Sequence, residues 1–196
     1  MTLPRPQALL LFIILVWSIS WPAIKIGVSV IPPLWFGVLR YAIASACLFA
    51  FVAMQGKLRL PAHRDWRLVI TLATLQLAVF AALTGIALTI LPPGRASVLA
   101  YTTPLWVAPL SVWFLSERMT WRRLGGIIMG LAGIAMIIAP SIQLQIQQDI
   151  AAYAMLLAAA ASWAMAIVYV KRHPFVGTPL ELAPWQMALA AVILAP

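Results

Sequence analysis

The stretch "WSISWPAIK" (Trp17–Lys25) ends a long uncharged run with a single lysine, and its outline returns 146 residues later as "WAMAIVYVK" (Trp163–Lys171). In both copies a tryptophan leads a lysine by eight residues. Sliding the sequence by 146 positions gives 10 identities over the 42 residues 9–50, and these include Trp, Lys and Pro in one register. Leucine and alanine matches are common in apolar segments, so the similarity of the two stretches has two possible explanations, an internal repeat or a chance alignment.

The composition is that of a membrane protein. Of 196 residues, 64% are hydrophobic and 9% are charged, with a mean hydropathy of +1.02. A soluble domain is about half apolar and about a quarter charged. So few charges do not cover a water-facing surface, which disfavours the alternative of a soluble protein with a large core.

Uncharged runs of lipid-crossing length follow one another along the chain. A helix needs about 20 apolar residues to cross about 30 Å of hydrocarbon. The runs of sufficient length cover residues 6–24, 68–94, 96–116, 124–148 and 150–170. Leu34–Met54 is a sixth segment that contains Arg40, and a seventh begins near Pro184, too short to cross before the sequence ends. Because a span must satisfy its backbone hydrogen bonds internally, the sequence predicts an all-α, multi-span helical bundle.

Basic residues alternate strongly between the two sides of the predicted membrane. One set of span ends holds ten of them, and the opposite set holds only Arg95, apart from Lys25 and Arg40 near or inside the membrane. The ten are Arg5, Lys57, Arg59, Arg64, Arg67, Arg118, Arg122, Arg123, Lys171 and Arg172. The positive-inside rule then predicts a multi-pass protein of the inner (plasma) membrane with a cytoplasmic N-terminus. The net charge of +9 is explained by topology, and without a continuous basic surface bearing aromatics no nucleic-acid partner is predicted.

The repeat, taken as real, has a consequence for topology. A shift of 146 residues carries the chain across five spans, an odd number, so the second copy begins on the opposite side of the membrane. Inverted-topology repeats are typical of secondary transporters, whose substrate binds between the halves near the bilayer midplane. We therefore expect Lys25 toward the outer face and Lys171 toward the cytoplasm.

Longer motifs carry a family resemblance. The first-span motif is joined by "FGVLRYAIASACL" (36–48) and by "PLWVAPLSVWFLSERMTWRRLGGIIMGLAGIAMI" (104–137), whose Ser-Glu-Arg turn before a glycine-rich span is the most specific piece. "ASWAMAIVYVKR" (161–172) and "LAPWQMALAA" (182–191) resemble the start of a second repeat. In these segments the chain resembles the EamA-type transporters of the drug/metabolite transporter superfamily.

The resemblance implies a fold of ten helices, five plus five, around a central cavity lined here by the first, third, fourth and sixth. Residues 1–140 would be the first repeat of five transmembrane helices, and residues 150–196 the incomplete start of the second, inverted repeat. About seven spans are present, so we expect this chain to be a fragment of the full transporter.

Candidate substrate-binding residues are polar or aromatic groups inside spans expected to line the pathway. Arg40 is the candidate whose charge costs most to place inside the membrane, and an intramembrane charge is a functional candidate by default. Its side chain can also snorkel outward to the surface. Lys25 lies closer to the surface; if both face the cavity, they favour an anionic substrate such as a carboxylate. The other candidates, for which interhelical hydrogen bonding is the alternative role, are Trp17, Ser20, Gln76, Tyr101, Thr102 and Trp163.

Five residues are expected to act structurally: Pro104, Glu117, Arg122, Gly126 and Gly130. Glu117 and the arginines after it predict an ion-pair network that fixes the cytoplasmic turn between the fourth and fifth spans. Gly126 and Gly130 form a GxxxG match, which serves packing within the monomer or a homodimer. Pro104, together with Pro109, predicts a kink in the fourth helix.

The sequence therefore predicts transport, most simply export, of a small metabolite, amino acid or drug-like solute by alternating access. No catalytic residue, metal or cofactor is expected, since His63 and His173 are far apart in sequence and Cys47 is the only cysteine. The partners expected are the lipid bilayer and a small-molecule solute. A lipid-modifying membrane enzyme and a non-transporting scaffold or assembly subunit remain the alternatives.

Overall fold

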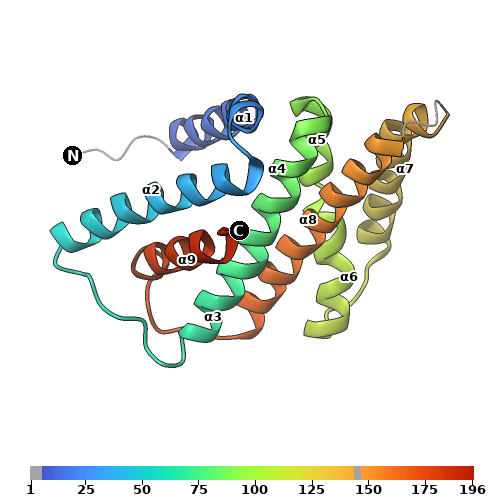
Figure 1. The fold of residues 1–196 in the computed structure, drawn as a ribbon. Helices are drawn as coiled ribbons and strands as arrows, with labels where there is room; N and C mark the ends of the chain where they lie inside the picture. The colour runs from blue at the N-terminus through green and yellow to red at the C-terminus, as the bar shows by residue number, and fades with distance from the viewer. Residues whose placement is uncertain (1–5, 144–146) are drawn as a thin grey trace.

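The computed structural model describes residues 6–143 and 147–196, and this part of the chain is a bundle of helices with short connections (Figure 1). The elements are α1 (Pro6–Val30), α2 (Pro33–Met54), α3 (Trp66–Thr71), η1 (Leu72–Val79), α4 (Phe80–Ile90), α5 (Pro93–Ala100), α6 (Thr103–Leu115), α7 (Trp121–Gln143), α8 (Gln147–Arg172) and α9 (Pro179–Leu194). Six helical stretches are long and apolar enough to cross a membrane, and α9 is a shorter apolar helix. The predicted all-α, multi-span class is confirmed.

The helices α4 and α8 form the centre of the bundle. In Figure 1, α4 and α8 cross the middle of the molecule side by side, with α2 and α9 to one side and α6 and α7 to the other. The main buried cluster joins α1, α4, α5 and α8 through residues such as Trp21, Leu88, Leu99 and Leu156. Burial of these side chains against one another fixes the helices that frame the cavity described below.

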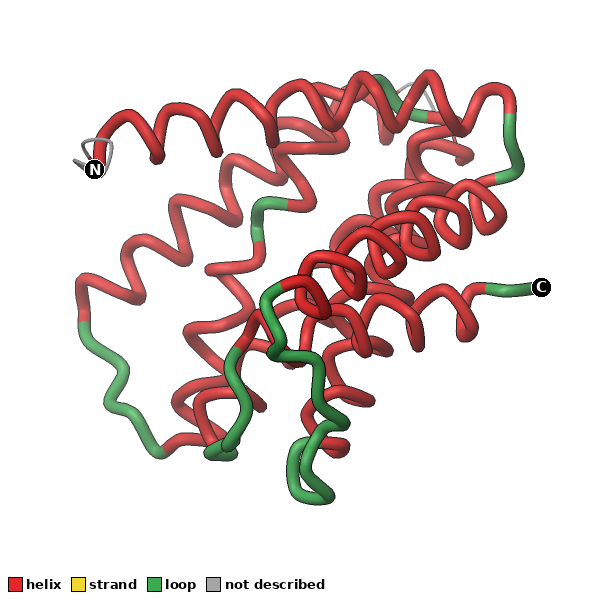
Figure 2. The backbone as a smooth tube through the Cα atoms, turned by 90° about the vertical axis from the view of Figure 1, so that its left-hand side faces the viewer, coloured by secondary structure: helices red, strands yellow, loops and turns green. Residues whose placement is uncertain are grey.

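The peripheral helices α1 and α7 present their apolar side chains outward. Only 6% of the apolar window of each is buried in the chain, and Figure 2 shows α1 lying along the outside of the bundle. Lipid tails solvate such side chains as well as a protein core does, so this exposure fits a bilayer and not water. The membrane-spanning character read from composition agrees with this arrangement.

The third span is continuous from Trp66 to Ile90 but contains the π-helical segment η1. A π-helix shifts the backbone hydrogen bonds to wider rings, and side chains from other helices bond its carbonyl oxygens. The Tyr41 hydroxyl donates to the Leu77 carbonyl at 3.3 Å, and the Ser162 hydroxyl donates to the Leu75 carbonyl at 3.0 Å. These bonds tie α2 and α8 to the third span.

The fourth span is broken rather than kinked. One helix bent at its prolines was expected, whereas the structure ends α5 at Ala100 and begins α6 at Thr103. Pro104 lies in the first turn of α6, where its missing N–H costs nothing. The hydroxyls of Thr102 and Thr103 donate to the carbonyls of Leu99 and Ala100, at 2.6 and 3.1 Å, and so satisfy groups at the break.

The last helix starts earlier than the sequence predicted. A start near Pro184 was expected, but α9 begins at Pro179, with Pro184 inside it. The reason is a capping box: the Thr178 hydroxyl accepts from the Glu181 N–H, and the Glu181 carboxylate accepts from the Thr178 N–H at 2.8 Å. Glu181 therefore belongs to the first turn of α9.

Two loops at one end of the bundle are fastened together by Asp65. This residue is 1% exposed, and its carboxylate accepts hydrogen bonds from the backbone N–H groups of Val176 and Gly177 at 3.0 and 2.9 Å. The α2–α3 connection is thereby held against the α8–α9 connection. The Trp185 indole adds a bond to the Arg59 carbonyl at 3.2 Å.

The two lysines of the sequence echo lie toward opposite ends of the bundle. The Lys25 ammonium donates to the carbonyls of Leu88 and Thr89, at the end of α4 that leads into α5. Lys171 lies beside Glu117, in the turn that follows α6. Because α4 and the α5–α6 span run in opposite directions along the chain, these two places lie toward opposite ends of these helices. The division into two inverted repeats remains a prediction.

Candidate functional site

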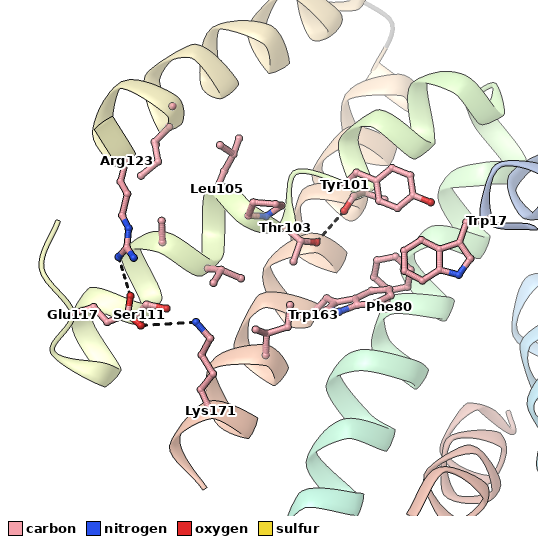
Figure 3. Close-up of a pocket in the computed structure, with 17 residues that line it drawn as sticks. Trp17, Phe80, Tyr101, Thr103, Leu105, Ser111, Glu117, Arg123, Trp163 and Lys171 are labelled. Atoms are coloured by element: carbon pink, nitrogen blue, oxygen red, sulfur yellow. Dashed lines mark hydrogen bonds and ion pairs between the residues drawn. The ribbon is translucent and has the colours of Figure 1, made fainter. Parts of the chain in front are cut away.

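A cavity of about 900 Å³ lies between α1, α4, α5, α6, α7 and α8. Its wall is mostly apolar, and Figure 3 shows two groups of side chains within it. Aromatic rings gather toward one end, and charged side chains gather at the other. Cavities that bind small organic ligands have this character, with an apolar wall and a few placed polar groups.

The aromatic group comes from three helices. Trp17 of α1, Phe80 of α4 and Trp163 of α8 line the cavity together. The rings of Phe80 and Trp163 meet edge to face, with centroids 4.5 Å apart and an interplanar angle of 84°. This arrangement is favourable for aromatic pairs and holds both rings in place. The wall therefore offers a fixed apolar surface to the body of a solute.

Beyond the aromatic group, α1 closes against the break in the fourth span. The Trp21 indole N–H donates to the Tyr101 hydroxyl at 2.9 Å, and the two rings meet at 78° with centroids 5.7 Å apart. Trp21 is buried, while Tyr101 lines the cavity. The contact joins α1 to the turn between α5 and α6, beside the cavity.

The charged end is built by Glu117, Arg123 and Lys171. The Glu117 carboxylate lies 2.8 Å from the Arg123 guanidinium and 3.8 Å from the Lys171 ammonium. Ser116, the residue before it, is in the left-handed region with φ 54°, an uncommon conformation for a residue with a side chain. This backbone reversal ends α6, and Figure 3 shows the Glu117 side chain between the two cations.

Ser111 adds an unusual polar group at the same end. Its side chain is 2% exposed and lines the cavity, and its hydroxyl oxygen is the one buried side-chain polar atom in the described ranges without a hydrogen-bond partner. A buried hydroxyl without a partner loses about 1–3 kcal/mol relative to a bonded one. Such a group calls for a ligand or another explanation.

The candidate substrate residues divide into two sets. Trp17, Tyr101 and Trp163 line the cavity. Thr102 lies next to it, and its neighbour Thr103 is the threonine in the wall. Ser20, Lys25, Arg40 and Gln76 are not among the described residues that line it.

Lys25 and Arg40 are engaged by acceptors within the bundle. Lys25 bonds backbone carbonyls of α4, and the Arg40 guanidinium donates to the Tyr41 hydroxyl at 2.9 Å while lying 4.7 Å from the centre of the Tyr41 ring. The Ser20 hydroxyl donates to the Val16 carbonyl in its own helix. Gln76 lies within η1. None of these four is among the described residues that line the cavity.

The residues expected to act structurally also differ in where they lie relative to the cavity. Pro104, Gly126 and Glu117 line the cavity. Gly130 packs within the chain, because a Cβ added there would lie 2.5 Å from the Leu105 side chain of α6. Close packing of α6 and α7 thus accounts for this glycine without a second copy.

The ion-pair partners of Glu117 were only partly anticipated. Glu117 pairs with Arg123, one of the arginines expected, but its second partner is Lys171, which had been considered only as part of the sequence repeat. A usable signal was present in the spacing of α8. Trp163, Ile167 and Lys171 follow one another at intervals of four residues and so share a helix face. That face is the cavity wall.

Lipid-length helices around a cavity with an aromatic wall and a charged end define a multi-span membrane transporter. Comparison with known proteins agrees. Residues 6–139 match the EamA-like transporter family, and the chain belongs to this family. The resemblance read from the motifs is confirmed.

Several curated relatives are similar over most of the chain. The "Uncharacterized transporter YvbV" of Bacillus subtilis (strain 168) is 30% identical over 190 residues, which are 97% of this chain and 61% of the relative. YoaV of the same organism is 28% identical, over 92% of this chain and 62% of the relative. The "Probable amino-acid metabolite efflux pump" of Salmonella typhimurium is 27% identical, over 84% of this chain and 52% of the relative.

The chain therefore spans about three fifths of the length of the first two relatives. No solved structure matches it. Within the described residues there is no group of three or more His, Cys, Asp or Glu side chains that could hold a metal ion.

Proposed function

We propose that this chain carries the solute cavity of an exporter that moves a small metabolite, amino acid or drug-like molecule out of the cell. In this proposal the protein lies in the inner membrane with its N-terminus in the cytoplasm, and it transports rather than catalyses a reaction. Membership of the EamA-like transporter family and the printed name of the Salmonella typhimurium relative, an efflux pump, support this direction.

The observation that carries the proposal is the cavity itself. Its volume of about 900 Å³ falls within the range of about 300–1,000 Å³ that small-ligand sites occupy. The charged end at Lys171 lies with the basic residues that the positive-inside rule assigns to the cytoplasm. A solute would enter there and place its apolar part against Trp17, Phe80 and Trp163.

Release on the outer side requires the Trp21–Tyr101 contact to open. Tyr101 lies at the break between α5 and α6, where the backbone already departs from helical geometry. Such breaks take up changes of backbone angle during gating motions. Alternating access between two inverted halves would then close the charged end as the aromatic end opens.

The test is uptake into inside-out vesicles that contain the full-length protein. A panel of radiolabelled amino acids, organic acids and cationic drugs is offered, and the solutes that accumulate define the substrate. Trp163→Ala should abolish most of this uptake, because it removes the ring that pairs with Phe80. Trp113→Ala is the matched control, since this tryptophan is 83% exposed and lies outside the cavity.

Two results contradict the proposal. One is the absence of uptake for every member of the panel in vesicles where the chain is folded and inserted. The other is equal loss of uptake in the Trp163 and Trp113 variants, which would mean that the cavity has no special part in transport.

A further inference from the structure

We propose that Lys171 and Ser111 form an anion subsite that binds the carboxylate of an amphipathic monocarboxylate, with the Glu117–Arg123 pair beside it. The inference rests on the proposed function, because it assigns a chemical class of solute to the same cavity. It replaces Lys25 and Arg40 as the source of anion selectivity.

The charge balance of the cavity favours one negative charge. The charged residues among those that line it are Glu117, Arg123 and Lys171, two cations and one carboxylate, which leaves one positive charge. The rest of the wall is mostly apolar. The three charged side chains are a third to a half exposed, so water screens the surplus positive charge and its attraction for an anion is modest.

The distances to Glu117 identify which of the two cations is available to bind a ligand. Arg123 donates a hydrogen bond to Glu117 at 2.8 Å, whereas the Lys171 ammonium lies 3.8 Å from the other carboxylate oxygen. A separation of 3.8 Å is beyond hydrogen-bond length, so this contact leaves the ammonium protons free for another acceptor. Lys171 is half exposed toward the cavity end and can turn to meet an incoming ligand.

Ser111 supplies the second, independent observation. Ser111 is among the residues that line the cavity, its buried hydroxyl has no hydrogen-bond partner, and Figure 3 places it with Glu117 and Lys171 at one end. A carboxylate there would accept one bond from the hydroxyl and one from the ammonium. The unpartnered group would thereby be satisfied, as buried polar groups in proteins almost always are.

The rest of α8 indicates what the carboxylate should be attached to. Ile167 and Trp163 follow Lys171 along the same helix face, and eight residues of helix extend about 12 Å. A ligand held by its carboxylate at Lys171 would lay an apolar body along Ile167 and reach the rings of Trp163 and Phe80. The predicted class is a monocarboxylate with an aromatic or branched aliphatic body of that length.

Binding measurements on the chain in phosphatidylcholine nanodiscs test the subsite. The probes are 3-phenylpropionate and its uncharged amide, which have the same body and differ in the charge of the head. We expect the carboxylate to bind about tenfold more tightly, the size typical of a hydrogen bond to a charged group. Lys171→Gln should remove the preference without changing binding of the amide.

Two further variants and a control sharpen the assignment. Ser111→Ala, a change of one buried oxygen, should lower the preference severalfold, and Glu117→Gln should raise it because a competing carboxylate is removed. Arg172→Gln removes a neighbouring exposed cation outside this cavity and should leave the preference intact. Retention of the preference in the Lys171 variant, or its loss in the Arg172 variant, would overturn the assignment.

The outcomes separate this inference from the proposed function. Equal binding of both probes would overturn the subsite and leave the solute cavity in place. Binding of neither probe would overturn the subsite and count against the cavity as well. Repeating the measurement with phosphatidylglycerol in the nanodisc adds an arm for lipid: a preference abolished there would assign the site to an anionic headgroup, against our proposal.

Discussion

Replacing Asp65 with alanine should be one of the most destabilising changes outside the lipid-crossing segments. The buried carboxylate accepts from the N–H groups of Val176 and Gly177, so both donors lose their partner in the variant. Hydrogen bonds to a charged group are worth about 1.5–3 kcal/mol each. Both N–H groups are only partly buried, so water replaces part of the lost hydrogen bonding. We therefore expect the free energy of unfolding to fall by about 2–4 kcal/mol.

The measurement is reversible unfolding of the purified chain in mixed micelles, followed by circular dichroism, together with hydrogen exchange at residues 173–178. The loop amides should exchange faster in Asp65→Ala, because the α8–α9 connection is released from the α2–α3 connection. His63→Ala is the matched control in the same loop: its side chain is exposed, and the expected change is within about 0.5 kcal/mol. A loss below 1 kcal/mol with unchanged exchange would refute the view that this carboxylate fastens the two loops.

Three other substitutions probe packing, capping and closure in the same unfolding assay. Gly130→Leu should cost about 1–3 kcal/mol through overpacking between α6 and α7, whereas Gly133→Leu, with no neighbouring atom in reach, should cost little. Thr178→Ala removes the capping box of α9 and should cost about 1 kcal/mol. Tyr101→Phe deprives the Trp21 indole of its acceptor and should cost about 1 kcal/mol, with increased quenching of tryptophan fluorescence by acrylamide as the closure loosens. Unchanged unfolding in Gly130→Leu, Thr178→Ala or Tyr101→Phe would contradict the contact that the variant removes or crowds.

The helical spans were predictable because length and hydrophobicity alone determine whether a segment can cross lipid. The exceptions are local. The start of α9 was placed too late because the seventh span was begun near Pro184, whereas Thr178 and Glu181 cap the helix five residues earlier, at Pro179. The break at Tyr101–Thr102 was missed because prolines suggested a kink, whereas the threonine hydroxyls stabilise a full interruption.

The candidate site was predictable in its aromatic part and not in its charged part. Trp17 and Trp163 lie inside spans, so a place in the wall followed from membrane depth and helix order. The pairing of Glu117 with Lys171 joins residues 54 positions apart and depends on how α8 packs against the α6–α7 turn. Likewise, a missing partner for Ser111 is a property of the packed bundle that no spacing rule reveals.

The hydrogen-bond partners of the cations distinguish Lys25 and Arg40 from Lys171. A cation inside a membrane span needs acceptors at all times, because leaving it unpaired costs several kilocalories per mole. Lys25 and Arg40 have such acceptors in carbonyl and hydroxyl oxygens, and these bonds leave little freedom to meet a solute.

Lys171 lies near the boundary, half exposed, where changing partners is inexpensive. A binding group must exchange one partner for another during each cycle, so the cation without a hydrogen-bonded partner is the better suited to recognise a transported anion. The same reasoning predicts that Lys25→Gln and Arg40→Gln lower stability more than they change solute preference, while Lys171→Gln does the reverse. Unfolding and probe binding measured on all three variants would show whether hydrogen bonding separates the roles, and a Lys25 or Arg40 variant that lost anion preference at full stability would contradict the reasoning.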